Sequence, residues 1–371
     1  MATVSKHLVG RAAELGSLDL VVEGLKRGQP AVSLLVGEPG IGKTRLLAEL
    51  AAHADARGCI VLTGSASELE ADLPFWIFVD ALEEYVAGLD PRRLASLDDD
   101  VRAELALVFP SLSDLAAAPR AVLQDERYRT HRAVRELLER VAATVPLVLV
   151  LDDVHWADAA SIELLAALLR RPPAAAVLLA LAARPRQVPD RLAGALERAC
   201  REGTVTRFEL GALRREEAGE LLGETVHGAL ADALYGESGG NPFYLEQLAR
   251  SLHRTGGPPP AAARTTLAGI EVPPAVAASV TDELALLAAG TRRVLEGGGR
   301  GRPVRAGAGG RRRGSGRDGR RGGHRRPARA RPDPVNGHTA SLPVPAPADS
   351  PGGVRDRAWR LAAGCARALR P

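Results

Sequence analysis

The sequence lacks several features that would place it in a specialised class. It has no apolar run of about 18 residues, so no transmembrane helix is expected. Residues 1–10 lack the long apolar core of a secretion signal. The three cysteines, Cys59, Cys200 and Cys365, lie far apart and form neither a metal-binding spacing nor a disulfide framework. These absences together predict a cytoplasmic protein that makes no contact with a membrane.

Lysine is nearly missing, and the charge is unevenly divided along the chain. Only Lys6, Lys26 and Lys43 occur beside 46 arginines. Residues 291–371 hold 20 arginines and 5 acidic residues, whereas residues 1–290 hold 29 basic and 40 acidic residues. The overall net charge of +4 therefore combines an acidic body with a basic tail. Such a division occurs in proteins that carry nucleic-acid-binding arms.

Short apolar runs alternate with segments of helical periodicity over the first 212 residues. The apolar runs, interpreted as strands, cover residues 32–36, 59–62, 147–151, 175–182 and 205–210. The amphipathic segments, interpreted as helices, cover residues 43–57, 75–89, 126–143, 161–170 and 190–201. Uninterrupted apolar strands that alternate with helices indicate a parallel sheet buried on both faces. We therefore expect an α/β fold with a doubly wound parallel sheet, followed by a small helical unit over residues 213–253.

A glycine-rich segment follows the first apolar run and fits the pattern GxxxxGK(S/T) without a gap. Its residues are Gly37, Glu38, Pro39, Gly40, Ile41, Gly42, Lys43 and Thr44. Glycines allow a tight loop whose backbone N–H groups converge on phosphate oxygens, and the positive end of the next helix adds to this anion site. Lys43 would reach the β- and γ-phosphates, and the Thr44 hydroxyl would bind Mg²⁺. The sequence thus predicts a P-loop that binds ATP with Mg²⁺, and we include the next residue, Arg45, in the cofactor site.

Two carboxylates end the strand expected over residues 147–151. Asp152 and Asp153 would lie at the carboxyl edge of the sheet, where open α/β folds bind their ligands. In that position Asp152 would hold Mg²⁺, and Asp153 would orient or deprotonate an attacking water. The plainer alternative is a strand followed by an aspartate-rich turn. The P-loop earlier in the chain favours the metal-binding interpretation.

Arg184 follows the fourth apolar run. A cation at this point could contact the γ-phosphate, so we group it with Lys43 and Asp153 as the predicted catalytic residues. The alternative is a solvated loop arginine in an arginine-rich chain. The residues alone leave both interpretations open.

Four strings of residues together resemble a known family. They are Leu8-Val9-Gly10-Arg11 with Glu14-Leu15, the loop from Gly37 to Thr44, the run Leu151-Asp152-Asp153-Val154-His155-Trp156-Ala157-Asp158, and Gly239-Gly240-Asn241-Pro242-Phe243-Tyr244. Over about residues 7–296 the chain resembles the Orc1-like AAA ATPase module of bacterial STAND regulators. The most similar type is the large ATP-binding LuxR-type transcriptional regulators of actinomycetes. Related modules occur fused to class III adenylate cyclases, although this chain shows no cyclase domain.

The resemblance implies roles for further residues. Val9, Gly10 and Arg11 would lie near the adenine and the ribose. Arg184 matches the family's sensor arginine. Pro242, with the preceding asparagine, would belong to a helical lid close to the nucleotide. For the histidine and tryptophan that follow the aspartate pair, packing beneath the site and contact with phosphate remain open.

Composition and resemblance together divide the chain into four parts. These are a P-loop ATPase core over residues 1–212, a helical lid over 213–255, a linker with an incomplete winged-helix start over 256–296, and a basic tail over 297–371. Residues 297–330 contain 12 glycines and 12 arginines with almost no large apolar side chain. Such a segment cannot bury enough surface to offset its ordering entropy, so we expect the tail to be disordered.

Two interpretations of this tail are open. The match to the family stops abruptly, and Ser341 to Asp356 can be back-translated so that the next reading frame resembles the family's downstream segment. A frameshift near Glu296 to Gly299 would therefore explain a tail that contains no lysine. Alternatively, its arginine runs would bind nucleic acid through phosphates. No aromatic residue is interleaved among those runs for base stacking.

These features predict a signalling ATPase, in which bound ATP and Mg²⁺ work a switch with slow hydrolysis, derived from a truncated LuxR-type transcriptional regulator. The expected partners are ATP and ADP, and self-association through the ATPase module is also considered. We do not expect DNA binding without the family's helix-turn-helix, which this chain does not show. The alternatives are a DNA-acting AAA ATPase that uses the basic tail, and a scaffold that binds nucleotide without hydrolysing it.

Overall fold

A five-stranded parallel sheet forms the centre of the computed structural model, which describes residues 8–90, 97–115, 123–223, 226–254 and 276. The strand order is β2-β3-β4-β1-β5, and all four neighbouring pairs are parallel. The strands are β1 (Ala31–Val36), β2 (Ile60–Ser65), β3 (Leu147–Asp152), β4 (Val177–Ala183) and β5 (Val205–Glu209). All five expected strands are present, and the doubly wound α/β fold is confirmed.

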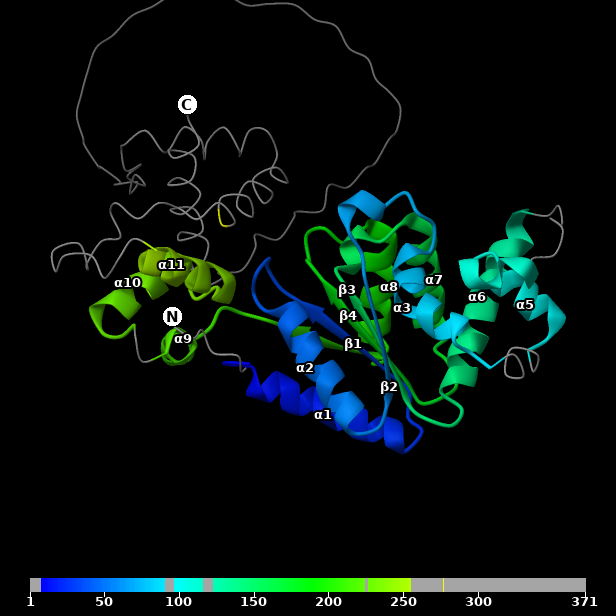
Figure 1. The fold of residues 1–371 in the computed structure, drawn as a ribbon, viewed down its shortest axis with the longest axis horizontal. Helices are drawn as coiled ribbons and strands as arrows, with labels where there is room; N and C mark the ends of the chain where they lie inside the picture. The colour runs from blue at the N-terminus through cyan, green and yellow to red at the C-terminus, as the bar shows by residue number, and fades with distance from the viewer. Residues whose placement is uncertain (1–7, 91–96, 116–122, 224–225, 255–275, 277–371) are drawn as a thin grey trace, which may run out of the picture.

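Helices cover both faces of this sheet (Figure 1). One face carries α1 (Ala12–Lys26) and α2 (Lys43–Ala56), as the packing of their side chains also shows. The other face carries α3 (Trp76–Ala87), α6 (Leu123–Val141), α7 (Ala159–Arg170) and α8 (Asp190–Arg201), and α5 (Asp99–Leu105) packs on the outer side of α6. Short 3₁₀ turns lie at η1 (Glu68–Glu70), η2 (Pro110–Leu115) and η3 (Val154–Trp156). Within the described residues, no helix is long and apolar enough to cross a membrane.

Side chains of the strands alternate between two apolar layers, which explains the uninterrupted apolar runs. On β1, Leu35 packs with α1 and α2, whereas Leu34 packs with the helices of the opposite face. On β3, Val148 packs on the face covered by α1 and α2, and Leu149 packs on the opposite face. Because a strand directs successive side chains to opposite faces, a strand with helices on both faces is apolar at most positions.

The helix α1 has no counterpart in the sequence-based expectations. Its signal is present, since Leu18, Val22 and Leu25 recur at helical spacing, and all three are buried. Leu18 and Val22 pack with α2 and with the central strands. Together with α2, the helix α1 therefore forms the helical layer on this face of the sheet.

Three helices beyond β5 form the lid. They are α9 (Arg215–Leu222), α10 (Ala229–Ser238) and α11 (Pro242–Arg254). Their inward side chains make a separate apolar cluster that includes Val9 from the N-terminal segment. The boundaries predicted between core, lid, linker and tail stay predictions. Of residues 255–371 the structure describes Val276 alone, so the expected winged-helix start, the disordered tail and the frameshift lie outside the described residues.

Asp158 joins the N-termini of two helices on one face of the sheet. Its carboxylate accepts hydrogen bonds from Ala160 N at 2.9 Å and Ser161 N at 2.9 Å at the start of α7. The same carboxylate accepts from Phe75 N at 3.0 Å and Trp76 N at 3.1 Å at the start of α3. Phe75 has a φ of 62°, a left-handed conformation that costs free energy in a bulky residue. The last residue of the aspartate string therefore caps two helices and holds this backbone turn.

Replacing Asp158 with alanine should lower the free energy of unfolding by about 2–4 kcal/mol, because two caps are lost and buried N–H groups are left unpaired. Chemical denaturation followed by circular dichroism measures this change. Asp98→Ala is the matched control, since Asp98 precedes α5 but its exposed side chain makes no capping bond. Equal stability losses in the two variants would contradict the double-cap interpretation.

Candidate functional site

A pocket of about 480 Å³ opens where the carboxyl edge of the sheet meets the lid. Most of the residues predicted for a nucleotide site line it. These are Val9, Arg11, Pro39, Gly40, Ile41, Gly42, Lys43, Thr44, Arg45, Asp153, Arg184 and Pro242. The pocket is also lined by residues not predicted for the site, which are Leu8, Ala48, Leu213, Leu221, Phe243 and Glu246. Of the predicted set, Gly10, Gly37, Glu38 and Asp152 do not line the pocket.

Strand order explains why distant residues meet at the pocket. The P-loop leaves β1, the aspartate pair ends β3, and Arg184 follows β4, which lies between those two strands. Since all three strands run parallel, their carboxyl ends lie at one edge of the sheet. Register fixes this edge, with Val36 beside Ala183 and Leu151 beside Leu181.

Backbone conformation and close packing explain why glycine occupies two positions of the P-loop. Gly40 and Gly42 have φ values of 71° and 102°, in the region that favours glycine. A Cβ atom on Gly40 would lie 2.6 Å from the Cβ of Phe243 in the lid. Gly42 also ends the loop immediately before α2, and no side chain from the described residues caps that helix. The first turn of α2 therefore keeps N–H groups that can bind an anion.

Lys43 is folded back onto the loop that precedes it. Its Nζ atom donates to the carbonyl oxygens of Gly37 at 3.0 Å and Glu38 at 3.1 Å, and the residue is only 6% exposed. Burial lowers the pKa of Lys43, Asp153 opposes this shift, and the positive charge of Arg184 adds to it. A phosphate would supply a negative partner for this buried ammonium group.

Thr44 and Asp152 meet directly. The Thr44 hydroxyl donates to Oδ2 of Asp152 at 2.6 Å, although the two residues are 108 positions apart in the chain. The other carboxylate oxygen, Oδ1, accepts from the backbone N–H of Asp153 at 2.8 Å. A hydroxyl and a carboxylate at this separation form a pair of hard oxygen ligands of the kind that Mg²⁺ prefers.

Asp153 lines the pocket in a strained backbone conformation. Its φ of 50° is left-handed, which is uncommon for a residue other than glycine and is found at functional sites. Burial raises the pKa of the Asp153 carboxyl, as does the neighbouring Asp152, whereas Arg184 and Lys43 lower it. A carboxylate with a raised pKa is better suited to accept a proton near neutral pH.

Arg184 faces the same pocket from the end of β4. Its Nε atom is buried and finds no hydrogen-bond partner among the described residues. Its charge acts on Lys43, Asp153 and His155. An anionic ligand in the pocket would satisfy the guanidinium group and offset the repulsion between the two cations.

Residues 7–181 match a family model described as the AAA ATPase domain. This part of the chain is an AAA ATPase domain. An uncharacterized protein of Rhizobium meliloti (strain 1021) is 29% identical over 257 residues, which cover 65% of this chain and 24% of that protein. The chain therefore spans about a quarter of the length of that curated relative. The finer affiliation with LuxR-type regulators stays a prediction.

Several solved structures resemble the chain at low sequence identity. The Orc1 protein of Aeropyrum pernix in complex with DNA is 15% identical, with a TM-score of 0.44 over 80% of this chain and 72% of that chain. Cdc6p of Pyrobaculum aerophilum is 15% identical, with a TM-score of 0.41 over 69% and 65%. AMPPCP-bound DnaA from Aquifex aeolicus is 17% identical, with a TM-score of 0.39 over 76% and 72%. The family match, and not these likenesses, identifies the AAA domain.

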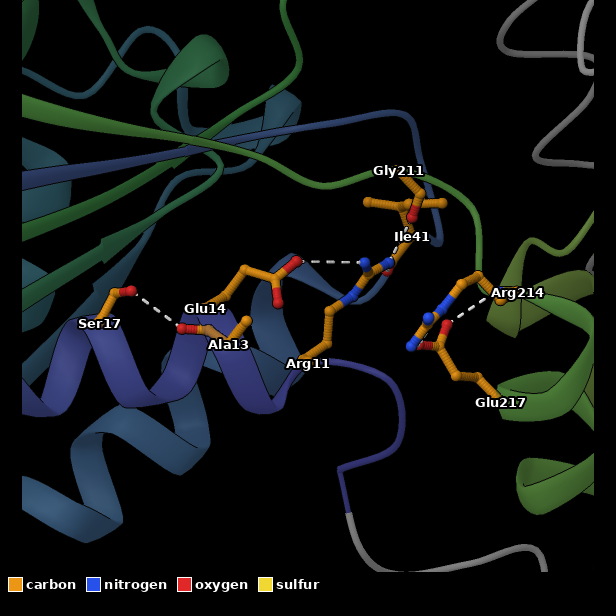
Figure 2. A network of polar contacts seen from close by, with 8 residues as sticks. All are labelled: Arg11, Ala13, Glu14, Ser17, Ile41, Gly211, Arg214 and Glu217. Atoms are coloured by element: carbon orange, nitrogen blue, oxygen red, sulfur yellow. Dashed lines mark hydrogen bonds and ion pairs between the residues drawn. The ribbon is translucent and has the colours of Figure 1, made fainter.

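Arg11 is bonded to the P-loop, to the segment after β5 and to α1 instead of pointing freely into the pocket. Its guanidinium donates to the carbonyl of Ile41 in the P-loop at 3.3 Å and to the carbonyl of Gly211 after β5. It also pairs with Glu14 at 3.5 Å (Figure 2). These bonds occupy the polar end of Arg11, so its contribution is to hold the P-loop against the lid connection. Direct contact with an adenine or ribose stays a prediction.

Val9 and Gly10, the neighbours of Arg11, pack against the lid. Val9 is buried in the apolar cluster of the lid helices. Gly10 has a φ of 68°, and a Cβ atom there would lie 2.7 Å from Cδ2 of Leu213. The N-terminal segment therefore forms one wall of the pocket, facing Leu213 and Leu221 of the lid.

The lid contacts the P-loop backbone directly. Asn241 Nδ2 donates to the carbonyl of Pro39 at 2.9 Å, and the N–H of Phe243 donates to the carbonyl of Gly40 at 3.2 Å. Asn241 Oδ1 also accepts from the N–H groups of Phe243 at 3.1 Å and Tyr244 at 3.4 Å, which caps α11. One side chain thus fixes both the start of a lid helix and the outer turn of the loop. The run from Gly239 to Tyr244 could be singled out in the sequence. The contact of Asn241 with the P-loop could not.

Proposed function

We propose that the chain binds ATP with Mg²⁺ in this pocket and hydrolyses it slowly. The observation that carries the proposal is the hydrogen bond between Thr44 and Asp152, which joins the P-loop to the end of β3. Around it lie a buried lysine, a half-buried arginine whose Nε is buried without a partner among the described residues, and a helix start that no described side chain caps. These groups fit a triphosphate and a hard divalent cation.

Each charged group has a part in this proposal. Lys43 would exchange its two carbonyl partners for the β- and γ-phosphates, and Arg184 would contact the γ-phosphate. Thr44 and Asp152 would hold Mg²⁺, which supplies charge neutralisation to the phosphates when bound. The apolar wall formed by the N-terminal segment and the lid suits a flat base such as adenine.

Hydrolysis would place a water molecule beside Asp153. The water oxygen forms a bond to the γ-phosphorus, the bond from phosphorus to the β–γ bridging oxygen breaks, and ADP leaves. The proton of the water passes to the Asp153 carboxylate, whose pKa is raised by burial. Positioning and electrostatic stabilisation by Lys43 and Arg184 supply the rest of the rate acceleration.

The same contacts suggest how nucleotide binding acts as a switch. Each carbonyl group of residues 37–41 accepts a hydrogen bond. The first two bind Lys43, the next two bind Asn241 and Phe243 of the lid, and the last binds Arg11. When Lys43 turns to phosphate, the Gly37 carbonyl loses the bond from Lys43, the Glu38 carbonyl keeps only the bond from the N–H of Ile41, and the loop adjusts. Because the next two carbonyls are bonded to the lid, that adjustment changes the position of the lid relative to the sheet.

We further propose that this switch belongs to a transcriptional regulator of the LuxR type. The support is the combined presence of the four strings of residues that resemble such regulators. Hydrolysis stimulated by DNA would favour the alternative of a DNA-acting ATPase instead. Bound ADP that survives purification and does not exchange would favour a scaffold without turnover.

Lys43→Ala should weaken the binding of Mg²⁺-ATP by about 100-fold or more, because it removes the cation nearest the β- and γ-phosphates. A titration with a fluorescent ATP analogue measures this affinity. Lys26→Ala is the matched control, since Lys26 lies at the end of α1 and pairs with Glu23 on the surface. Unchanged affinity in Lys43→Ala would sink the proposed binding mode.

Asp153→Asn should keep nucleotide affinity within about threefold while the rate of phosphate release falls by about 100-fold or more, because the acceptor for the water proton is lost. Asparagine tolerates the left-handed backbone of this position, so the turn should remain folded. Asp55→Asn, an exposed position near the end of α2, serves as the control. Equal rates of phosphate release in the wild type and Asp153→Asn would show that another group acts on the water.

Asn241→Ala should uncouple the lid from the P-loop, because it removes both the bond to Pro39 and the cap of α11. In the wild type, Mg²⁺-ATP should change the hydrogen exchange of amides in α11. In the variant this response should fall by more than half, while nucleotide affinity changes little. Ser17→Ala, on the exposed face of α1, is the control. A full response of α11 in Asn241→Ala would rule out this route of coupling.

A further inference from the structure

His155 is a buried polar side chain to which the proposed function gives no role. It lies on η3, two residues after Asp153, and its side chain is fully buried. Neither ring nitrogen has a hydrogen-bond partner among the described residues. A buried polar group without a partner destabilises the fold, and an apolar residue of similar shape would avoid that cost.

The imidazole of His155 is neutral near pH 7. Burial, together with the positive charges of Arg184 and Lys43, lowers the pKa of His155 to about 3. A neutral imidazole carries one N–H donor and one acceptor. His155 therefore cannot act as a cation toward phosphate, but it can donate one hydrogen bond.

The carboxylate of Asp153 is the candidate acceptor for this donor. Nδ1 of His155 lies 3.7 Å from Oδ1 of Asp153, slightly beyond hydrogen-bond distance. The 3₁₀ turn between them is fixed by the bond from Trp156 N to Asp153 O at 2.9 Å. The tilted ring of Trp156, with its centroid 5.4 Å away, packs beside the imidazole. A small rotation of the Asp153 carboxylate would complete the bond to Nδ1.

We propose that His155 is a positioning residue for Asp153. Its Nδ1–H group donates to the Asp153 carboxylate and directs the remaining oxygen toward the attacking water. This inference rests on the proposed ATP hydrolysis for its consequence, but the hydrogen bond itself belongs to the chain alone. It also explains why a histidine occupies a fully buried place beneath the pocket, next to a carboxylate in a strained backbone conformation.

Three substitutions separate a hydrogen bond from packing. His155→Asn places an amide N–H near the position of Nδ1, His155→Gln places one near Nε2, and His155→Phe keeps the ring volume without a donor. We expect kcat for ATP hydrolysis to fall by about 10- to 100-fold in the Gln and Phe variants and by less than about threefold in the Asn variant. KM and nucleotide affinity should change little in all three. Activity in the Phe variant equal to or above that of the Asn variant would overturn the proposal.

A double variant tests whether His155 acts through Asp153. In an Asp153→Asn background, His155→Phe should cause no further loss of kcat, because the carboxylate that it positions is already gone. An independent loss of similar size in both backgrounds would show that His155 acts by another route. A general loss of folding would instead lower the melting temperature and affect both backgrounds equally.

A measurement that does not depend on hydrolysis completes the test. The full chain is labelled with ¹⁵N-histidine, and the signals of His155 are identified by their disappearance in His155→Asn. We expect a neutral ring protonated at Nδ1, with a shift of that signal when Mg²⁺ and adenylyl imidodiphosphate are added. A ring protonated at Nε2 both with and without the nucleotide would overturn the proposal. If the chain binds or hydrolyses no ATP, the proposed function fails, while the tautomer in the free chain still decides the role of His155.

Discussion

The meeting of Thr44 and Asp152 is the constraint on which the rest of the site depends. It requires the ends of β1 and β3 to lie at one edge of the sheet, with β4 between them, and this arrangement brings Arg184 into the same pocket. The two helical layers are what make this order stable, since β1, β3 and β4 carry buried apolar side chains on both faces. A change in register on any of the three strands would separate the hydroxyl from the carboxylate. The chemistry of the site is thus a consequence of how the core packs.

The pocket contains several buried charged groups, although removing a charge from water is unfavourable by itself. Lys43 is almost fully buried, an Arg184 nitrogen is buried without a partner, and Asp153 carries a raised pKa. Each of these is costly in the free chain, and each is relieved by an anionic ligand with a divalent cation. Such a site stores part of the free energy that ligand binding releases, which suits a domain whose conformation follows its ligand. In the proposed switch, the lid would follow that change because Asn241 and Phe243 are bonded to the loop itself.

The run from Leu151 to Asp158 combines several physical roles in eight residues. Its first aspartate lies against the P-loop threonine, and its second lines the pocket in a left-handed conformation. Its histidine is buried beside that second aspartate. Its last aspartate caps α3 and α7 and so holds the turn that follows β2. The string is therefore as much a folding element as a part of the proposed site, and only one of its residues, Asp153, lines the pocket.

The sequence by itself determined the features that arise from local pattern. We predicted the five strands, the P-loop from Gly37 to Thr44 and the carboxylates at the end of β3. Apolar runs and glycine spacing can be recognised directly in the sequence. The sequence left open whether Arg184 was solvated, and it gave no reason for the bonds of Arg11, for the double cap by Asp158 or for the contact of Asn241 with Pro39. Each of these joins residues that are remote in sequence, by 30 positions for Arg11 and Ile41 and by 202 for Asn241 and Pro39. Only the tertiary structure decides such pairs, since a hydrogen bond depends on where the packed layers bring donor and acceptor together, and not on the spacing of residues along the chain.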